Sequence, residues 1–81
     1  MRGKGIGTIA AKMITNYGFT TMGFRRIEAA VDVDNSASQK LLMSAGYSKE
    51  GILRQRVTRS NGSQIDMVEL AVIADEWKEL D

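Results

Sequence analysis

Residues 35–47 read Asn-Ser-Ala-Ser-Gln-Lys-Leu-Leu-Met-Ser-Ala-Gly-Tyr, and this stretch predicts a helix with both of its ends. Ser36 followed three residues later by Gln39 is the capping-box pattern, so we expect the helix to begin at Ser36. Gly46 is typical of the residue that stops a helix. The apolar side of this helix consists of Ala37, Leu41, Leu42 and Ala45. The flanking segments then decide the fold class.

Segments on both sides of this helix are predicted to be strands. Before it, apolar and polar residues alternate over residues 26–33, which is typical of a half-buried strand. After it, a strand near residues 47–59 leads to Asn61-Gly62, a strong signal for a hairpin turn. A last strand over residues 64–73 is apolar on both faces apart from Glu69, so we expect it inside a sheet.

The first part of the chain is a basic, glycine-rich stretch, residues 2–7, that runs straight into a helical pattern. We expect an amphipathic helix that ends at Gly18 or Gly23, and a second, short one over residues 74–80. The apolar positions of the first helix recur at helical spacing, at Ile6, Ile9, Ala10, Met13, Ile14 and Tyr17.

The order of predicted elements is loop, helix, strand, helix, strand, turn, strand. We interpret it as a mixed sheet in an α+β (mixed α/β) fold. The chain has 81 residues, which is one small domain at most. The first helix has no strand before it, so we infer that part of the sheet is missing from this sequence.

Composition excludes several functional classes. The chain has no cysteine and no histidine, which excludes disulfides and cysteine-ligated metals and disfavours zinc and Ser-His-Asp chemistry. We therefore expect no metal site. Eleven basic and ten acidic side chains give a net charge of +1, which argues against nucleic-acid binding through a large basic field. No apolar run approaches the roughly 20 residues that span a membrane, and the lack of cysteine is compatible with the cytoplasm.

The glycine-rich start has two interpretations. Gly3, Gly5 and Gly7 would let the backbone approach a ligand closely, and free amides at a helix start favour an anion. Arg2 and Lys4 add positive charge. The stretch matches neither the dinucleotide nor the Walker fingerprint. Taken alone, it is either a phosphate-binding loop or a flexible lead into a helix.

Taken together, the two glycine-containing stretches resemble the GNAT N-acetyltransferase family. Arg2-x-x-Gly5-x-Gly7 resembles the family's acetyl-CoA pyrophosphate motif. Residues 35–47 resemble its next element, in which Asn-x-x-Ser opens a helix and a Gly-aromatic pair ends it. The residues that resemble the RimJ/RimL branch, which acetylates N-terminal amines of ribosomal proteins, are Lys49-Glu50-Gly51-Ile52-Leu53-Arg54, Asn61-Gly62, Asp66 and Glu76-Trp77. The resemblance implies that residues 1–81 are a single partial domain, the C-terminal half of the GNAT fold.

The resemblance also implies how acetyl-CoA would be held. It places the cofactor pyrophosphate on the amides of Gly3 to Thr8 and Asn35 beside the pantetheine arm, with Lys40 reaching a phosphate. The cofactor-binding residues expected in this way are Arg2, Gly3, Lys4, Gly5, Ile6, Gly7, Thr8, Asn35, Ser38 and Lys40.

The reaction implied is direct attack of a neutral amine on the thioester of acetyl-CoA, which needs a base for the amine and an acid for the thiolate. Many relatives place a tyrosine acid where this chain has Leu42. In the RimJ/RimL branch that the chain resembles, a serine at the position of Ser38 has this role, so the resemblance makes Ser38 our candidate acid; alternatively, it is a first-turn serine that bonds to backbone. Glu69 is a weak candidate base, because burial would raise its pKa, although such a glutamate more often faces a groove or pairs with an arginine. Glu28 and Asp66 are weaker candidates.

Four further side chains are open to two interpretations each. Arg54 and Arg56 are two residues apart, so we expect them on one strand face. There they either attract an acidic acceptor or form a plain solvated surface. Tyr47 and Trp77 are expected in the core or at a dimer surface.

The sequence therefore predicts an acetyl-CoA-dependent N-acetyltransferase of the RimJ/RimL type that acts on a primary amine such as a protein N-terminus. The resemblance places the missing half before this chain, so we interpret the sequence as a truncated or misannotated reading frame, a fragment, or a chain that pairs with another copy. We expect a cytoplasmic homodimer, in one form with an intertwined sheet. The alternatives are a non-catalytic acetyl-CoA-binding or self-associating module and a structural fragment that binds nothing.

Overall fold

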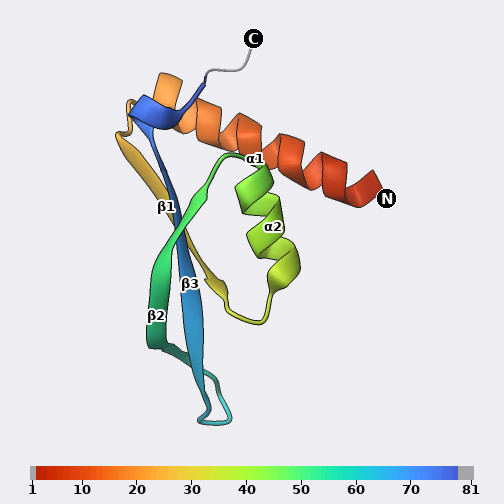
Figure 1. The fold of residues 1–81 in the computed structure, drawn as a ribbon, viewed down its shortest axis with the longest axis vertical. Helices are drawn as coiled ribbons and strands as arrows, with labels where there is room; N and C mark the ends of the chain where they lie inside the picture. Colours follow the sequence, from red (N-terminus) through yellow and green to blue (C-terminus); the bar gives the residue numbers. More distant parts are fainter. Residues whose placement is uncertain (1, 79–81) are drawn as a thin grey trace.

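The computed structural model describes the backbone of residues 2–78 and the side chains from Gly7 to Lys78 (Figure 1). Its elements are helix α1 (Arg2–Thr20), strand β1 (Arg26–Asp32), helix α2 (Ser36–Ser44), strands β2 (Ser48–Thr58) and β3 (Gln64–Ile73), and 3-10 helix η1 (Ala74–Glu76). This order confirms the predicted succession of helix, strand, helix and two strands. The helix predicted over residues 74–80 is reduced to the single turn of η1, and residues 79 and 80 lie outside the described part.

The three strands form one antiparallel sheet in the order β1-β3-β2. The prediction that the last strand lies inside the sheet is confirmed, since β3 pairs with both neighbours. The prediction of a mixed sheet is wrong. β1 and β2 run in the same direction, but β3 lies between them, so residues 2–78 contain no parallel strand pair. The connection through α2 therefore skips one strand position.

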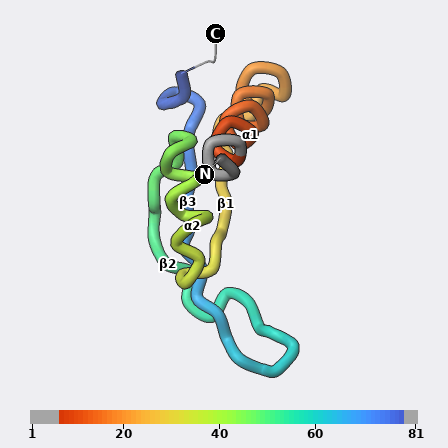
Figure 2. Tube along the Cα trace, turned by 90° about the vertical axis from the view of Figure 1, so that its right-hand side faces the viewer, coloured from red at the N-terminus to blue at the C-terminus, as the bar shows by residue number. Residues whose placement is uncertain are grey.

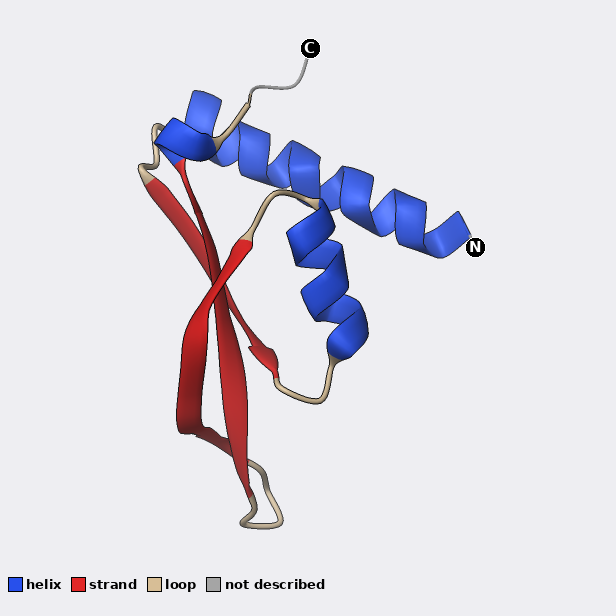
Figure 3. Cartoon of the chain, in the orientation of Figure 1, coloured by secondary structure: helices blue, strands red, loops and turns tan. Residues whose placement is uncertain are grey.

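Both helices lie on the same face of the sheet (Figures 2 and 3). Because side chains alternate along a strand, Val68, Leu70 and Val72 of β3 point toward the helices and form the core with Ala45 and Tyr47. Leu70 is fully buried. The intervening residues of β3, among them Glu69, therefore lie on the face that carries no helix.

Tyr47 and Trp77, which were expected in the core or at a dimer surface, both pack in or against the core. Tyr47 is buried, and its hydroxyl lies 2.8 Å from Thr15 Oγ1, a buried hydrogen bond that joins α1 to the segment between α2 and β2. Trp77 packs against Phe19 with ring centroids 5.8 Å apart and donates from Nε1 to Asn16 Oδ1 at 2.9 Å. The chain after β3 is thereby fixed to the last turns of α1.

Helix α2 begins as predicted at Ser36, but its cap differs from the predicted capping box. Asn35 is the N-cap, and its Oδ1 accepts a hydrogen bond of 3.1 Å from the Ser38 amide. Gln39 does not reach back to the cap; its Nε2 donates to the carbonyl of Val33 at 3.0 Å. Gly46 follows the helix at φ +108°, which confirms the predicted stop.

The β2–β3 connection confirms the Asn61-Gly62 hairpin signal. Arg59 and Ser63 pair across the turn, and the Gly62 amide donates to the Arg59 carbonyl at 2.9 Å. Gly62 has φ +88°, a conformation that other residues adopt only with strain. The turn therefore sets the register in which β2 meets β3.

Candidate functional site

The glycine-rich start of the chain is helical, so the predicted phosphate loop is wrong as a local structure. Residues 2–7 belong to α1 from its first residue. Gly23, Gly46 and Gly62 are the glycines with positive φ in the described part, and none of them lies in this stretch. A helix leaves only the amides of its first turn unpaired, so the amides of Ile6 to Thr8 are engaged in the helical ladder. The cofactor-binding residues predicted in this stretch are therefore not tested by the fold. Only the backbone amides in the first turn of α1 are free to bind a ligand.

Gly7 serves a different purpose from the one that its motif suggests. A Cβ atom at this position would lie only 2.7 Å from Leu41 Cδ1 of α2. The absence of a side chain therefore lets α1 and α2 pack closely. This packing brings the middle of α2 against the first half of α1.

The start of α2 carries the other predicted cofactor-binding side chains. Asn35 and Lys40 are exposed and Ser38 is half-buried. Because Asn35 Oδ1 caps the helix through the Ser38 amide, the side-chain NH2 group is the part of Asn35 with capacity for a ligand. This bond uses the backbone amide of Ser38, so both interpretations of its hydroxyl, a candidate acid and a first-turn serine that bonds to backbone, stay predictions.

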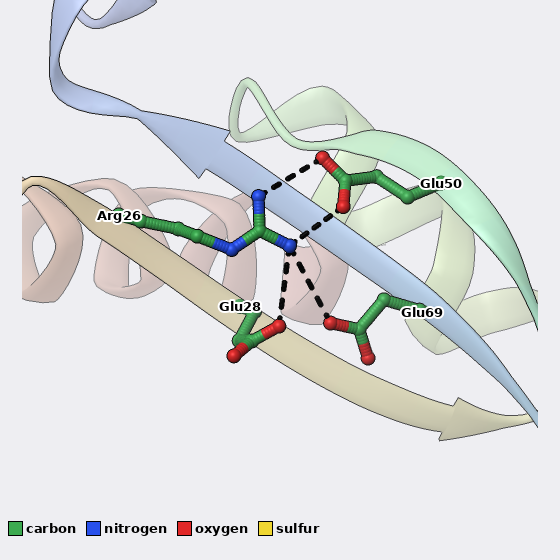
Figure 4. Close-up of polar contacts among 4 residues, drawn as sticks. All are labelled: Arg26, Glu28, Glu50 and Glu69. Atoms are coloured by element: carbon green, nitrogen blue, oxygen red, sulfur yellow. Dashed lines mark hydrogen bonds and ion pairs between the residues drawn. The ribbon is translucent and has the colours of Figure 1, made fainter.

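The structure does not bring the two catalytic candidates together. Ser38 lies on α2, which packs on the helix-covered face of the sheet, whereas Glu69 lies on the other face with the groove-lining residues (Figure 4). Strand β3 therefore stands between them. Within one chain, Ser38 and Glu69 would have to act on different parts of a substrate.

Glu69 instead belongs to a cluster of four charged side chains, Arg26, Glu28, Glu50 and Glu69, which we call the acidic cluster (Figure 4). Arg26 lies at its centre. The Arg26 Nη2 atom is 2.6 Å from Glu50 Oε1, 3.2 Å from Glu28 Oε1 and 3.7 Å from Glu69 Oε2. One guanidinium thus faces three carboxyl groups, one from each strand.

The carboxyl groups of the acidic cluster differ in pKa. The pKa of Glu69 is raised above the ordinary value because its carboxyl is hydrogen-bonded to that of Glu28 and is partly desolvated. The hydrogen bond with Glu69 and that with Arg26 lower the pKa of Glu28. The hydrogen bond from Arg26 lowers the pKa of Glu50, and the same contact raises the pKa of Arg26. Glu69 is therefore the carboxyl group of this cluster that holds its proton most tightly.

The acidic cluster borders an open groove of about 660 Å³ on the helix-free face of the sheet. Its lining residues are Glu28, Ala29, Ala30, Glu50, Gly51, Ile52, Leu53, Arg56 and Glu69. Carboxylates at the border of such a groove attract ammonium groups, and the raised pKa of Glu69 keeps its proton bound to a higher pH than in an ordinary glutamate. The groove therefore has the chemistry of an amine-binding site.

Sequence reasoning missed Arg26 and Glu50 as members of this cluster. Period-two alternation was sufficient to place Arg26 and Glu28 on one face of β1. Glu50 joins them from β2 because the register shifts between Lys49 and Gly51. A glycine inside a strand pattern is typical of a bulge, so Gly51 is the sequence signal that could have marked this irregularity.

A second irregularity changes the interpretation of Arg54 and Arg56. The β2–β3 register shifts between Leu53 and Val57, and Gln55 has φ +52°. The Gln55 amide donates to Asp66 Oδ1 at 2.8 Å, so Asp66 holds this bulge. The prediction that Arg54 and Arg56 share a strand face assumed regular alternation, and the bulge at Gln55 interrupts that alternation. Both side chains are exposed.

Over residues 2–78, no group of acidic side chains is arranged to hold a metal ion. None of the helices in that part is both long and apolar enough to cross a membrane.

Two helices on one face of a three-stranded antiparallel sheet, with a basic glycine-rich stretch opening the first helix, form an α+β arrangement. The sequence profile of the acetyltransferase (GNAT) domain matches residues 1–48. This chain belongs to the GNAT acetyltransferase family.

Three relatives illustrate the match. The uncharacterized N-acetyltransferase p20 of Bacillus licheniformis is 37% identical over 75 residues, which are 93% of this chain and 42% of p20. The spermidine N(1)-acetyltransferase of Escherichia coli K12 is 36% identical over 52 residues, 64% of this chain and 28% of that enzyme. The crystal structure of the ribosomal-protein-S5-alanine acetyltransferase from Vibrio fischeri has a TM-score of 0.83 and 32% identity, covering 96% of this chain and 42% of that one.

These matches confirm the predicted partial α+β GNAT fold. They also show that this chain spans less than half the length of each of the three relatives.

Proposed function

We propose that this chain is the acetyl-CoA-binding, C-terminal half of an N-acetyltransferase of the RimJ/RimL type. The observation that carries the proposal is the GNAT match over residues 1–48, because it contains both motif-bearing helix starts and the strand between them. The likeness to an S5-alanine acetyltransferase, at 32% identity over nearly the whole chain, supports the RimJ/RimL assignment.

The cofactor would be held at the first turn of α1. Unpaired amides and the positive end of the helix dipole favour a pyrophosphate there, and Arg2 and Lys4 contribute charge. Asn35 would donate from its side-chain NH2 group to the pantetheine arm, and the exposed Lys40 would reach a phosphate. Gly7 packs against Leu41. We therefore assign binding of the cofactor pyrophosphate to the residues before Gly7.

The reaction would transfer the acetyl group in one step. The amine nitrogen forms a bond to the thioester carbonyl carbon, the carbon–sulfur bond breaks, and the amine loses a proton while the thiolate gains one. Ser38 is our candidate donor of the proton to sulfur. Glu69 has the raised pKa that a base requires, but its position on the other face makes acceptor binding the role that fits it better.

The acceptor would bind beside the acidic cluster through a positive charge remote from its reacting nitrogen, because Ser38 lies on the other face of the sheet. Three carboxyl groups, Glu28, Glu50 and Glu69, lie with two arginines, Arg26 and Arg56, so the groove has one carboxyl group more than it has guanidinium groups. A protein N-terminus is the proposed acceptor, and the likeness to an S5-alanine acetyltransferase supports a protein substrate. Spermidine, which the name of another relative gives as its substrate, is the competing acceptor. A cytoplasmic location and a homodimer belong to the same proposal.

The second candidate function is a non-catalytic acetyl-CoA-binding or self-associating module. The observation in its favour is that the chain covers 42% of p20, so residues that shape an acceptor site in a complete enzyme are not in this sequence.

A thiol-release assay separates the two candidates. The chain is incubated with acetyl-CoA and either a peptide with an N-terminal alanine or spermidine, and free coenzyme A is measured. The proposal predicts turnover that is faster with the peptide and is lowered by Ser38→Ala about 10²-fold, as for loss of a general acid. Ser44→Ala, at the exposed far end of α2, is the matched control. Turnover that Ser38→Ala leaves unchanged removes Ser38 as the acid, and no turnover with either amine favours the non-catalytic module.

A further inference from the structure

Gln39 is a buried polar side chain that the proposed reaction does not use. It is 7% exposed and is the buried residue of α2. Glutamine mostly lies at the surface of proteins, because burying an amide group without hydrogen bonds costs free energy. An apolar residue would fill the same space without that cost, so the amide group of Gln39 requires an explanation.

The side-chain amide of Gln39 binds the backbone at the end of β1. Its Nε2 atom donates to the Asp32 carbonyl at 3.3 Å and to the Val33 carbonyl at 3.0 Å. Asp32 is the last residue of β1, and Val33 begins the short connection that leads to α2 at Ser36. The two bonds therefore fasten α2 to the backbone of this connection.

The same connection contains Asn35, the predicted ligand of the pantetheine arm. The Asn35 amide donates to the Asp32 carbonyl at 2.9 Å, which is one of the two acceptors of Gln39. The Asn35 Oδ1 atom accepts from the Ser38 amide at 3.1 Å. The backbone and the side-chain oxygen of Asn35 are thus both hydrogen-bonded, which fixes the direction of its side-chain NH2 group.

A second side chain supports this connection from the loop between β2 and β3. Arg59 Nη2 lies 3.0 Å from Asp32 Oδ2, while Asp32 Oδ1 accepts from the Asp34 amide at 2.8 Å. The side chains of Arg59 and Asp32 are 54% and 27% exposed, so this ion pair contributes less than the buried contacts of Gln39. Gln39 is therefore the main restraint on the connection.

We propose that Gln39 is a positioning residue for acetyl-CoA. By holding the carbonyls of Asp32 and Val33, it fixes the connection so that the NH2 group of Asn35 stays directed at the pantetheine arm. Gln39 itself touches neither the cofactor nor the acceptor and acts only through Asn35. The inference rests on the proposed function, since it takes Asn35 as a ligand of acetyl-CoA.

Calorimetry of the 81-residue chain with two probes tests the proposal. The first probe is acetyl-CoA, and the second is the nucleotide portion of coenzyme A, which keeps the pyrophosphate and lacks the pantetheine arm. Gln39→Met keeps an unbranched side chain of similar length and removes the amide group. We expect it to lower the affinity for acetyl-CoA about fivefold, the effect of one lost hydrogen bond. The affinity for the nucleotide portion should not change.

Two further variants separate positioning from a purely structural role. Thr15→Val also removes a buried hydrogen bond, but it lies on α1, so it should leave the ratio of the two affinities unchanged. Asn35→Asp keeps the helix cap and removes the NH2 group, so it should cause the same loss as Gln39→Met. Combining Gln39→Met with Asn35→Asp should then have no further effect, because both act through the same group.

Three results would overturn the proposal. They are an unchanged affinity of Gln39→Met for acetyl-CoA, an equal loss with both probes, and losses that add in the double variant. Far-UV circular dichroism shows whether each variant folds. If Gln39→Met does not fold, Arg59→Gln replaces it: the affinity for acetyl-CoA alone should fall about twofold, and no change would overturn the proposal. If the native chain binds neither probe, the proposed function fails together with this inference, whereas native binding that Gln39→Met leaves unaltered removes the inference alone.

Discussion

At the residue scale, the buried hydrogen bond between Thr15 and Tyr47 connects α1 to the end of α2 over 2.8 Å. Thr15→Val and Tyr47→Phe each leave one buried hydroxyl unsatisfied, so each should lower the free energy of unfolding by about 1–3 kcal/mol. The double variant should cost clearly less than the sum, because neither hydroxyl remains. Urea unfolding of the four proteins measures the coupling. Costs that simply add would mean that this bond does not connect the two elements.

The acidic cluster predicts a pH dependence with opposite signs for two of its carboxyl groups. Glu69 has a raised pKa in the folded chain, so its ionisation opposes folding as the pH rises past the ordinary glutamate value. Glu69→Gln should therefore raise Tm at pH 7, and the difference should vanish as the pH falls below about 4. The distant contact to Arg26, at 3.7 Å, is too weak to reverse the sign.

Glu50 provides the matched comparison. Its pKa is lowered by Arg26, so its contribution is present above the ordinary glutamate pKa and is lost as the pH falls. Glu50→Gln should lower Tm at pH 7 and have little effect in acid. Thermal unfolding between pH 3 and pH 8 measures both variants. If Glu69→Gln and Glu50→Gln shift Tm in the same direction at pH 7, the assignment of the two carboxyl groups is wrong.

At the element scale, α2 offers a direct comparison of the predicted and observed caps. Asn35 accepts from the Ser38 amide, so Asn35→Ala should cost about 1 kcal/mol of stability. Ser36, which the sequence pattern favoured as the cap, is the first helical residue, and Ser36→Ala should change stability by less than about 0.5 kcal/mol. Chemical denaturation of both variants decides between them, and a larger cost for Ser36→Ala would restore the capping box.

The elements also show where sequence reasoning reaches its limit. Periodicity and turn residues were sufficient for β1, β2, β3 and α2, because each carries its own local signal. The antiparallel sheet was not predictable, since the insertion of β3 between β1 and β2 is a property of the whole topology. The start of α1 was assigned as a loop because glycine permits both states, and local pattern does not choose between them.

The candidate site was likewise predictable only in part. Asn35, Ser38 and Lys40 were found by their order in a motif, and the structure places all three at the start of α2 or within its first turns. The acidic cluster was found only in part. Arg26 and Glu50 meet across β3, and that contact depends on a register shift between Lys49 and Gly51.

At the scale of the whole molecule, the chain has the arrangement of part of a larger domain. Its core is organised around Leu70 and Val72, yet the largest apolar face of α1 remains exposed. Both features agree with a family member that covers less than half of each relative. We propose that this part of the domain contains the acetyl-CoA-binding site.

Isothermal titration calorimetry of the 81-residue chain with acetyl-CoA tests that claim most directly. The variant Gly5→Glu places a carboxylate in the first turn of α1, and Ser60→Glu in the exposed β2–β3 connection is the matched control. We predict micromolar binding by the native chain and by Ser60→Glu, and its loss in Gly5→Glu. No binding of the native chain at millimolar acetyl-CoA, or equal binding by Gly5→Glu, would contradict the account.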